Sequence, residues 1–258
     1  MCVLALFTCV ALTAFSAQAK VVSQFNACPQ FFYERTEPSG MDQNAKKICQ
    51  MLENNRNFYF ATLYSTHHRI PLYSAYVFDP QCSEIAGRTD VWYLEPQISS
   101  PQIAINHMVR PSVLRAQLDL NTIKKYQAIN PDYSDTGYDR GHLNPNGFQC
   151  NESRDATFTL TNAAPMDACF NRVQWKNWED KLKMLLQRER DGTAYIVTGT
   201  VPNANLRIPQ SPHPQNSNRV TVPSHIWTAV CFKHQSDPRK SYSFAYIGDN
   251  QPVNTITL

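Results

Sequence analysis

Tyr138-Asp139-Arg140-Gly141-His142 opens the stretch that decides the fold, which continues to Glu179. Leu160-Thr161-Asn162-Ala163-Ala164-Pro165 lies in its middle, and the segment from Asn171 to Glu179 closes it. Arginine binds phosphate through two parallel donors, histidine titrates near neutral pH, and magnesium takes a few oxygen ligands. Together these side chains are typical of a phosphodiester-cleaving site.

The closing segment is predicted to begin a helix that runs over about 172–190. Five apolar residues recur at the spacing of one buried helix face; they are Trp175, Trp178, Leu182, Leu185 and Leu186. Asn171 and Glu179 are separated by about 12 Å along a helix that rises ~1.5 Å per residue. We therefore expect Asn171 to bind an ion directly and the longer Glu179 to reach back toward ion-bound water.

The rest of the chain predicts an α+β domain with an antiparallel-dominated sheet and flanking helices. Of 258 residues, 42% are hydrophobic and 17% charged, which is the composition of a globular protein rather than a disordered one. Aromatic and β-branched runs predict strands, whereas 45–52 favours a short helix and 202–217 a loop. The predicted strands cover 58–64, 70–78, 193–201, 219–222, 225–232 and 242–247.

Residues 1–19 contain no charged side chain and end in the small-x-small pattern Ala17-Gln18-Ala19. An apolar run of this length is too short to span a membrane and is typical of a secretory signal peptide. We therefore expect a secreted protein without a membrane anchor, consisting of one domain over 20–258. Asn151-Glu152-Ser153 is its glycosylation sequon.

Six cysteines follow the predicted signal peptide: Cys28, Cys49, Cys82, Cys150, Cys169 and Cys231. An even number in an oxidising compartment favours disulfides, although the spacing does not reveal their pairing. A zinc site is the alternative, but the sequence contains no Cys-x-x-Cys pair. We therefore predict a disulfide-stabilised domain.

The sequence resembles the secreted and mitochondrial DNA/RNA non-specific endonucleases, which carry a ββα-metal (His-Me finger) motif. Three motifs carry the resemblance; they are Asp139-Arg140-Gly141-His142, Thr161-Asn162-x-x-Pro165 and Asn171-x3-Trp175-x3-Glu179. With its cysteines and predicted secretion, this sequence resembles the vertebrate endonuclease domain-containing 1-like proteins within that family. The similarity covers about 55–250 of this sequence. The family usually continues through a further helix and strand, so its last elements are expected to be missing here.

The resemblance implies a role for each matching residue. His142 corresponds to the general base, Asn171 to the Mg2+ ligand, and Glu179 to the carboxylate that holds metal-bound water. Asn162 supports the site, and Arg140 is the arginine of the motif. Arg69, from His68-Arg69-Ile70-Pro71, corresponds to an arginine that approaches the phosphate, and Lys183 stands where some relatives carry arginine.

The implied activity is cleavage of DNA and RNA with Mg2+, or alternatively Mn2+, and no sequence specificity. The net charge of +3 is mild, and basic residues outnumber acidic ones along 172–190. Because no base-reading motif occurs, nucleic acid is expected to bind through its phosphate backbone. Two other functions fit the residues: an inactive secreted nucleic-acid-binding protein of the same fold, and a metal-dependent phosphodiesterase for small nucleotides.

Each residue also has a structural alternative. His142 could be a buried structural histidine, Asn171 a helix N-cap, and Glu179 a surface partner of Lys183. Asn162 could belong to an ordinary turn, and Arg69 could be a surface charge. The sequence leaves the oligomeric state open.

Overall fold

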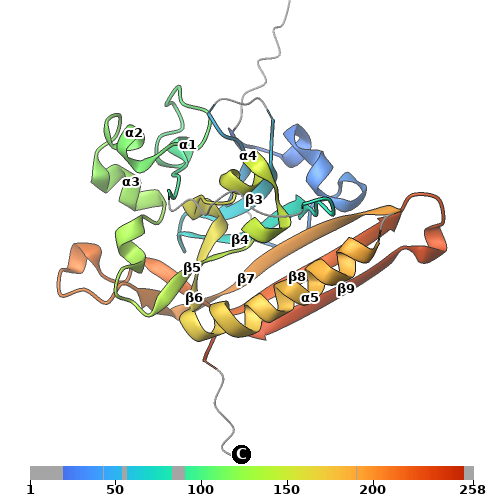
Figure 1. Ribbon diagram of the computed structural model, residues 1–258. Coiled ribbons are helices and arrows are strands. Elements are labelled where there is room, and N and C mark those ends of the chain that lie inside the picture. Colours follow the sequence, from blue (N-terminus) through green and yellow to red (C-terminus); the bar gives the residue numbers. More distant parts are fainter. Residues whose placement is uncertain (1–19, 43, 54–56, 83–90, 190, 253–258) are drawn as a thin grey trace, which may run out of the picture.

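The computed structural model of the chain describes residues 20–42, 44–53, 57–82, 91–189 and 191–252. Within these residues, seven antiparallel strands form one sheet in the order β1-β2-β3-β4-β7-β8-β9 (Figure 1). They are β1 (Lys20–Val22), β2 (Lys46–Gln50), β3 (Phe60–Ser65), β4 (Ile70–Val77), β7 (Gly192–Ile208), β8 (Val220–His234) and β9 (Tyr242–Asp249). A separate ribbon pairs β5 (Tyr138–His142) with β6 (Ala163–Asp167).

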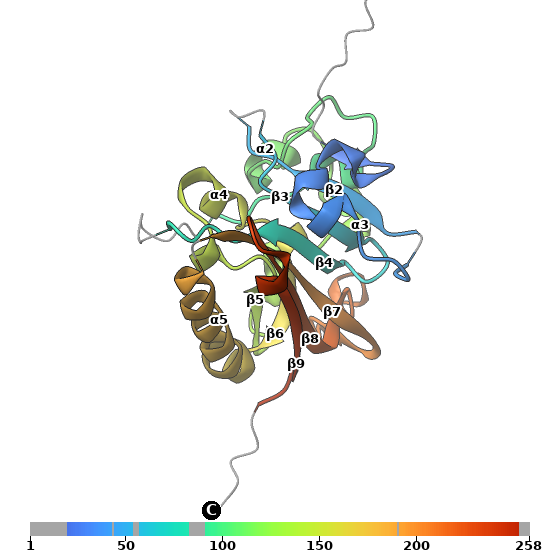
Figure 2. The same ribbon diagram turned by 90° about the vertical axis from the view of Figure 1, so that its right-hand side faces the viewer.

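The helices are short except for the last one. They are α1 (Pro96–Ser99), α2 (Pro111–Arg115), α3 (Leu120–Tyr126), α4 (Asn151–Ala156) and α5 (Lys176–Arg188). A π-helical turn, η7 (Phe170–Trp175), leads directly into α5. Both views place α4, α5 and the β5–β6 ribbon on the same side of the large sheet (Figures 1 and 2).

The hydrophobic core lies on both sides of the central strands, which explains their aromatic and β-branched composition. Every residue of β3 is buried, and β4 is buried except at its last residue. On one side, Phe25 and Phe32 pack near Tyr73. On the other side, Leu182 and Leu186 of α5 belong to one cluster with residues of β7 and β8. The predicted α+β class and antiparallel sheet are confirmed.

Three local predictions were wrong because tertiary contacts override local preference. Residues 46–50 form β2 rather than a helix, since they pair with β3 along their whole length. Residues 202–208 continue β7 rather than opening a loop. Leu185 is 41% exposed because it lies at the margin of the apolar stripe of α5, whereas Leu182 and Leu186 are buried.

In the part of the chain that the structure describes, two disulfides cross-link the domain, Cys28–Cys49 and Cys82–Cys150. The predicted disulfide-stabilised domain is confirmed, and within the described residues Cys169 and Cys231 are free thiols. Cys169 precedes η7 and Cys231 lies on β8. An even count of cysteines carries no information about which of them the fold brings within bonding distance.

Among the described helices, none is both long and apolar enough to cross a bilayer. The predicted signal peptide, residues 1–19, lies outside the described residues.

Candidate active site

The β5–β6 ribbon followed by η7 and α5 forms a ββα unit. Its register pairs Tyr138 with Asp167 and His142 with Ala163, so His142 stands at the end of the ribbon. Gly141 is required at its position because a Cβ there would overlap the side chain of Met166 on the partner strand. The Asp-Arg-Gly-His stretch is therefore a strand in which the Met166 side chain packs closely against the backbone at Gly141.

A pocket of about 920 Å3 opens where the ββα unit meets α4. Five of the seven predicted site residues line it: Arg140, His142, Asn171, Glu179 and Lys183. Further basic side chains on its wall are Arg154, Arg172 and Lys176. The pocket thus combines three carboxylates of the ββα unit, Asp139, Glu179 and Asp180, with a predominantly basic lining. A concave basic lining of this kind suits an anionic ligand.

His142 lies in an aromatic setting. Its ring centroid is 4.8 Å from that of Trp92 and 4.7 Å from that of Phe158. Arg140 lies over the same Trp92, with 5.2 Å between its guanidinium carbon and the ring centroid. Arg140 also donates to Asn130 at 3.2 Å. Trp92, only 2% exposed, therefore fixes the two functional side chains relative to one another.

Asn171 is held by Asp139, a residue the sequence analysis did not single out. The Asn171 amide nitrogen donates to Asp139 Oδ2 at 2.9 Å, and Arg172 donates to both oxygens of the same carboxylate. Because the amide nitrogen faces Asp139, the carbonyl oxygen is turned the other way and can act as a ligand. The signal for Asp139 was its place at the start of the Asp-Arg-Gly-His motif.

Asn171 is not the helix N-cap. It lies inside η7, and the amide groups of Cys169 and Phe170 donate to Asp167 Oδ1 at 2.9 and 3.0 Å. Asp167 therefore caps the helix start. The N-cap alternative for Asn171 is removed, and its side chain serves the pocket instead.

Glu179 lies two helical turns further along and lines the same pocket. Although part of the side chain remains exposed, burial of its carboxyl among protein atoms raises its pKa to about 8. The positive charge of Lys176 opposes this shift, and the negative charge of Asp180 adds to it. A carboxyl in such a setting ionises more readily when a cation is bound beside it.

Asn162 is absent from the pocket lining; it is buried and holds the chain that follows His142. Its Oδ1 accepts from the Asn144 amide at 2.9 Å and from Ser74 Oγ at 2.8 Å. Its Nδ2 donates to the carbonyl oxygens of Asn144 and Thr157 at 3.0 and 2.9 Å. Because Asn162 is fully buried, these bonds make it a positioning residue.

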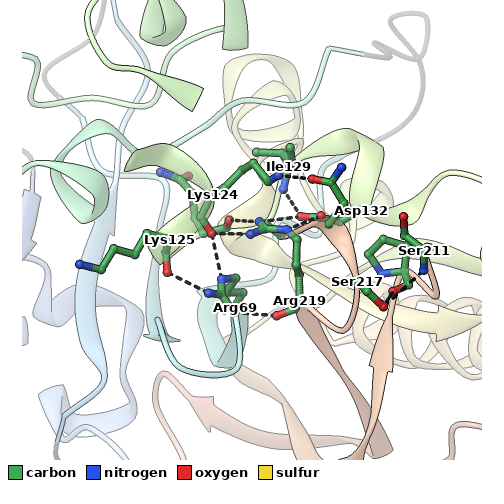
Figure 3. Close-up of polar contacts among 12 residues, drawn as sticks. Arg69, Lys124, Lys125, Ile129, Asp132, Ser211, Ser217 and Arg219 are labelled. Atoms are coloured by element: carbon green, nitrogen blue, oxygen red, sulfur yellow. Dashed lines mark hydrogen bonds and ion pairs between the residues drawn. The ribbon is translucent and has the colours of Figure 1, made fainter. Parts of the chain in front are cut away.

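Arg69 does not join this group. Its guanidinium donates to three backbone carbonyls, those of Lys124, Lys125 and Arg219 (Figure 3). It is absent from the pocket lining. With its donors engaged in tying the β3–β4 turn to α3 and β8, Arg69 is placed for a structural task.

The oxygen donors of the pocket fit a hard divalent cation. Magnesium binds through one or two protein oxygens and keeps several waters. The Asn171 carbonyl and the Glu179 carboxylate are such donors. Among the described residues, no group of three or more histidine, cysteine or acidic side chains is arranged to hold a metal.

Residues 41–257 match the sequence model of the DNA/RNA non-specific endonucleases. The chain belongs to this family. The family assignment agrees with the ββα unit, which brings two of the three motifs to one pocket, while Asn162 of the third holds the chain that follows His142.

Endonuclease domain-containing 1 protein of Homo sapiens is 36% identical over 210 residues, which cover 80% of this chain and 39% of the human protein. The Mus musculus protein of the same name is 31% identical over 240 residues, covering 90% of this chain and 43% of the mouse protein. This endonuclease-family chain spans about two fifths of the length of these two relatives.

A chain in the crystal structure of the EndoG/EndoGI complex superposes with a TM-score of 0.51 and 20% sequence identity. The match covers 77% of this chain and 74% of that chain. At this identity the likeness is one of fold, and it supports the ββα-metal architecture.

Proposed function

We propose that this chain is a secreted, Mg2+-dependent endonuclease that hydrolyses phosphodiester bonds of DNA and RNA without sequence specificity. The observation that carries the proposal is the convergence of His142, Asn171 and Glu179 on one basic pocket. A non-catalytic fold would not need these three side chains to share a cavity. The two disulfides support an oxidising location.

His142 is the general base. Its imidazole takes a proton from a water that attacks phosphorus, because histidine can accept a proton near neutral pH. Trp92 and Phe158 hold the ring in place and keep bulk water from its faces. Asn162 fixes the backbone just after His142, which limits movement of the base.

Arg140 and Lys183 bind the substrate phosphates. Arg140 presents a guanidinium fixed by Trp92 and Asn130, and Lys183 adds a positive charge from α5. Such contacts reach the sugar–phosphate backbone rather than base edges, so they give no sequence specificity. A pocket that reads only phosphates accepts both DNA and RNA.

Asn171 and Glu179 would hold the cation, with Asp139 fixing the Asn171 amide. The chemistry supplied by bound Mg2+ would be stabilisation of negative charge on the phosphate and on the departing 3′ oxygen. Products would carry 5′-phosphate ends, as the family resemblance implies. Mn2+ has the same ligand preference and is expected to substitute.

The test is a cleavage assay on plasmid DNA and on a long RNA, with Mg2+, with chelator, and with Mn2+ added back. We expect both polymers to be cut with either ion and neither with chelator. A small phosphodiester is assayed in parallel. Faster turnover of the small ester than of polymer would replace the proposal with a nucleotide phosphodiesterase. Binding of polymer without cleavage would replace it with a binding protein.

A further inference from the structure

We propose that Asn151 carries an N-linked glycan at the rim of the pocket, and that this glycan limits access by wide polynucleotides. The inference rests on the proposed function and secretion, and it adds a modification site that controls which substrates reach the pocket. Three observations carry it: the sequon, the placement of Asn151, and the anchoring of the rim.

Asn151 is exposed, as a glycosylated residue must be, and it also lines the pocket. It is the first residue of α4, and Arg154, three positions later, lines the pocket as well. Because both residues line the pocket, this side of α4 faces it. Glu152 points elsewhere and accepts from Tyr59 at 2.9 Å.

The rim that carries Asn151 is anchored. Cys150 is bonded to Cys82, and the Gln149 amide donates to the Val77 carbonyl and to Asn144 at 3.1 and 3.2 Å. Phe148 is buried in the core. A glycan attached to Asn151, directly after Cys150, is therefore held on an anchored segment and not on a loose loop. Its root stays at the mouth of the pocket.

The modification itself follows from the amide chemistry of the sequon. The Asn151 side-chain nitrogen forms a bond to the anomeric carbon of a lipid-linked oligosaccharide diphosphate, and the bond from that carbon to the diphosphate oxygen breaks. The amide loses one proton, and the lipid diphosphate leaves. Neither oxidant nor reductant is needed. The exposed position of Asn151 leaves room for a bulky, solvated glycan.

A glycan at this rim should discriminate by width. One flexible strand can pass beneath it and place a phosphate beside His142, whereas a duplex must bring a second strand across the rim. Such a steric obstacle acts against one class of ligand and leaves another untouched, which is how specificity arises from exclusion. The glycosylated chain should therefore favour single-stranded over double-stranded substrates more strongly than the unglycosylated chain.

The experiment uses the full chain expressed in a secreting eukaryotic cell line. Ser153→Ala removes the sequon without touching Asn151, and Ser153→Thr keeps it as a matched control. Intact mass is measured before and after enzymatic glycan removal. Binding of labelled single-stranded and duplex DNA is then measured in chelator, so that the result does not depend on catalysis, and cleavage with Mg2+ is measured separately.

We expect one glycan on the unmodified sequence and on Ser153→Thr, and none on Ser153→Ala. Ser153→Ala should bind duplex several-fold more tightly, with single-strand binding unchanged. A wild-type chain without glycan, an unchanged ratio of duplex to single-strand binding, or no binding to either DNA would overturn the inference. If the duplex-to-single-strand binding ratio changes as expected but none of the three chains cleaves DNA with Mg2+, the result counts against the proposed nuclease activity and not against the glycan.

Discussion

Two arginine–aspartate pairs in this molecule have opposite environments. Arg219 and Asp132 are nearly buried, with side-chain exposures of 7% and 4%, and Arg219 also donates to the carbonyls of Lys124 and Gln127 (Figure 3). Arg172 and Asp139 stand at the pocket, with exposures of 69% and 22%. The buried pair holds α3 and the following turn to β8, whereas the exposed pair orients Asn171.

The bonding of each guanidinium separates structural from functional arginines in this chain. A guanidinium whose donors are engaged by backbone carbonyls has little left to offer a phosphate. Arg69, beside Arg219, shares this property. A guanidinium at the pocket, such as that of Arg140, is fixed by a ring and one amide. Both Arg69 and Arg140 occupy motif positions, so it is the hydrogen-bond partners of each guanidinium that distinguish a structural arginine from one that can bind phosphate.

The largest expected effect is on stability. Arg219→Ala leaves the Asp132 carboxylate buried without its partner, and breaking such a pair costs about 3–5 kcal/mol. Arg172→Ala removes an exposed pair, for which about 0–1 kcal/mol is expected. Urea unfolding of the two variants measures the contrast. Equal losses in free energy of unfolding would show that the buried pair has no special structural role.

The second prediction concerns Glu95, a buried acid which, unlike Asp132, has a side-chain oxygen with no hydrogen-bond partner among the described residues. Burial raises its pKa to about 7. The folded chain then binds more protons than the unfolded chain between the ordinary carboxyl pKa and about 7. Stability should fall as pH rises through this window and level off above it.

Glu95→Gln should remove this dependence, because the neutral amide keeps the shape of the protonated carboxyl. At pH 8 the variant should exceed the wild type by at most roughly 3 kcal/mol, the energy of such a pKa difference. At pH 4 the two should be alike. Denaturant unfolding at several pH values measures this. Parallel pH curves for the two chains would contradict the prediction.

The third prediction concerns Asp139 and its hold on Asn171. Asp139→Ala should reduce metal-dependent cleavage about 10–100-fold, the usual cost of losing a residue that orients a metal ligand. Most of the loss should be recovered at high Mg2+ concentration, because the ligand itself remains. Arg172→Ala is the matched control, since it keeps the Asp139–Asn171 bond. If both variants lose activity equally, charge rather than orientation is responsible.

The smallest expected effect separates Lys183 from Arg69. Lys183→Ala should raise the KM for DNA several-fold and weaken its salt dependence, because one phosphate contact is lost. Arg69→Ala should lower the melting temperature and leave KM nearly unchanged. Steady-state kinetics at two salt concentrations, with thermal unfolding in parallel, compares them. A raised KM in Arg69→Ala with normal stability would return Arg69 to the substrate site.

The sequence predicted best what is local. The helix carrying Glu179 is a short-range pattern and is present, whereas the strand ending in His142, also present, was implied only by the ββα motif of the family. The family resemblance related them to Asn171. Strand β2 was missed because its pairing with β1 and β3, rather than its local sequence, makes it a strand.

Contacts between segments that are distant in the sequence could not be predicted from local patterns. The rings of Trp92 and His142 are in contact although fifty residues separate them in the sequence. Asp139 accepts a hydrogen bond from Asn171 only when the β5–β6 ribbon and η7 pack together. Arg69 matched a family position, yet its donors are engaged by carbonyls of α3 and of Arg219, just before β8, which no local pattern indicates. The disulfide between Cys82 and Cys150, at the rim of the pocket, is likewise a long-range contact that no local pattern predicts.

The most direct test of the account is the cleavage rate of His142→Ala on plasmid DNA and long RNA with Mg2+, measured together with its melting temperature. His213→Ala, in an exposed loop away from the pocket, is the control. We expect His142→Ala to fold normally and to lose cleavage of both polymers by at least about 100-fold, as removal of a general base does, while His213→Ala stays fully active. Full activity in a folded His142→Ala would contradict the account.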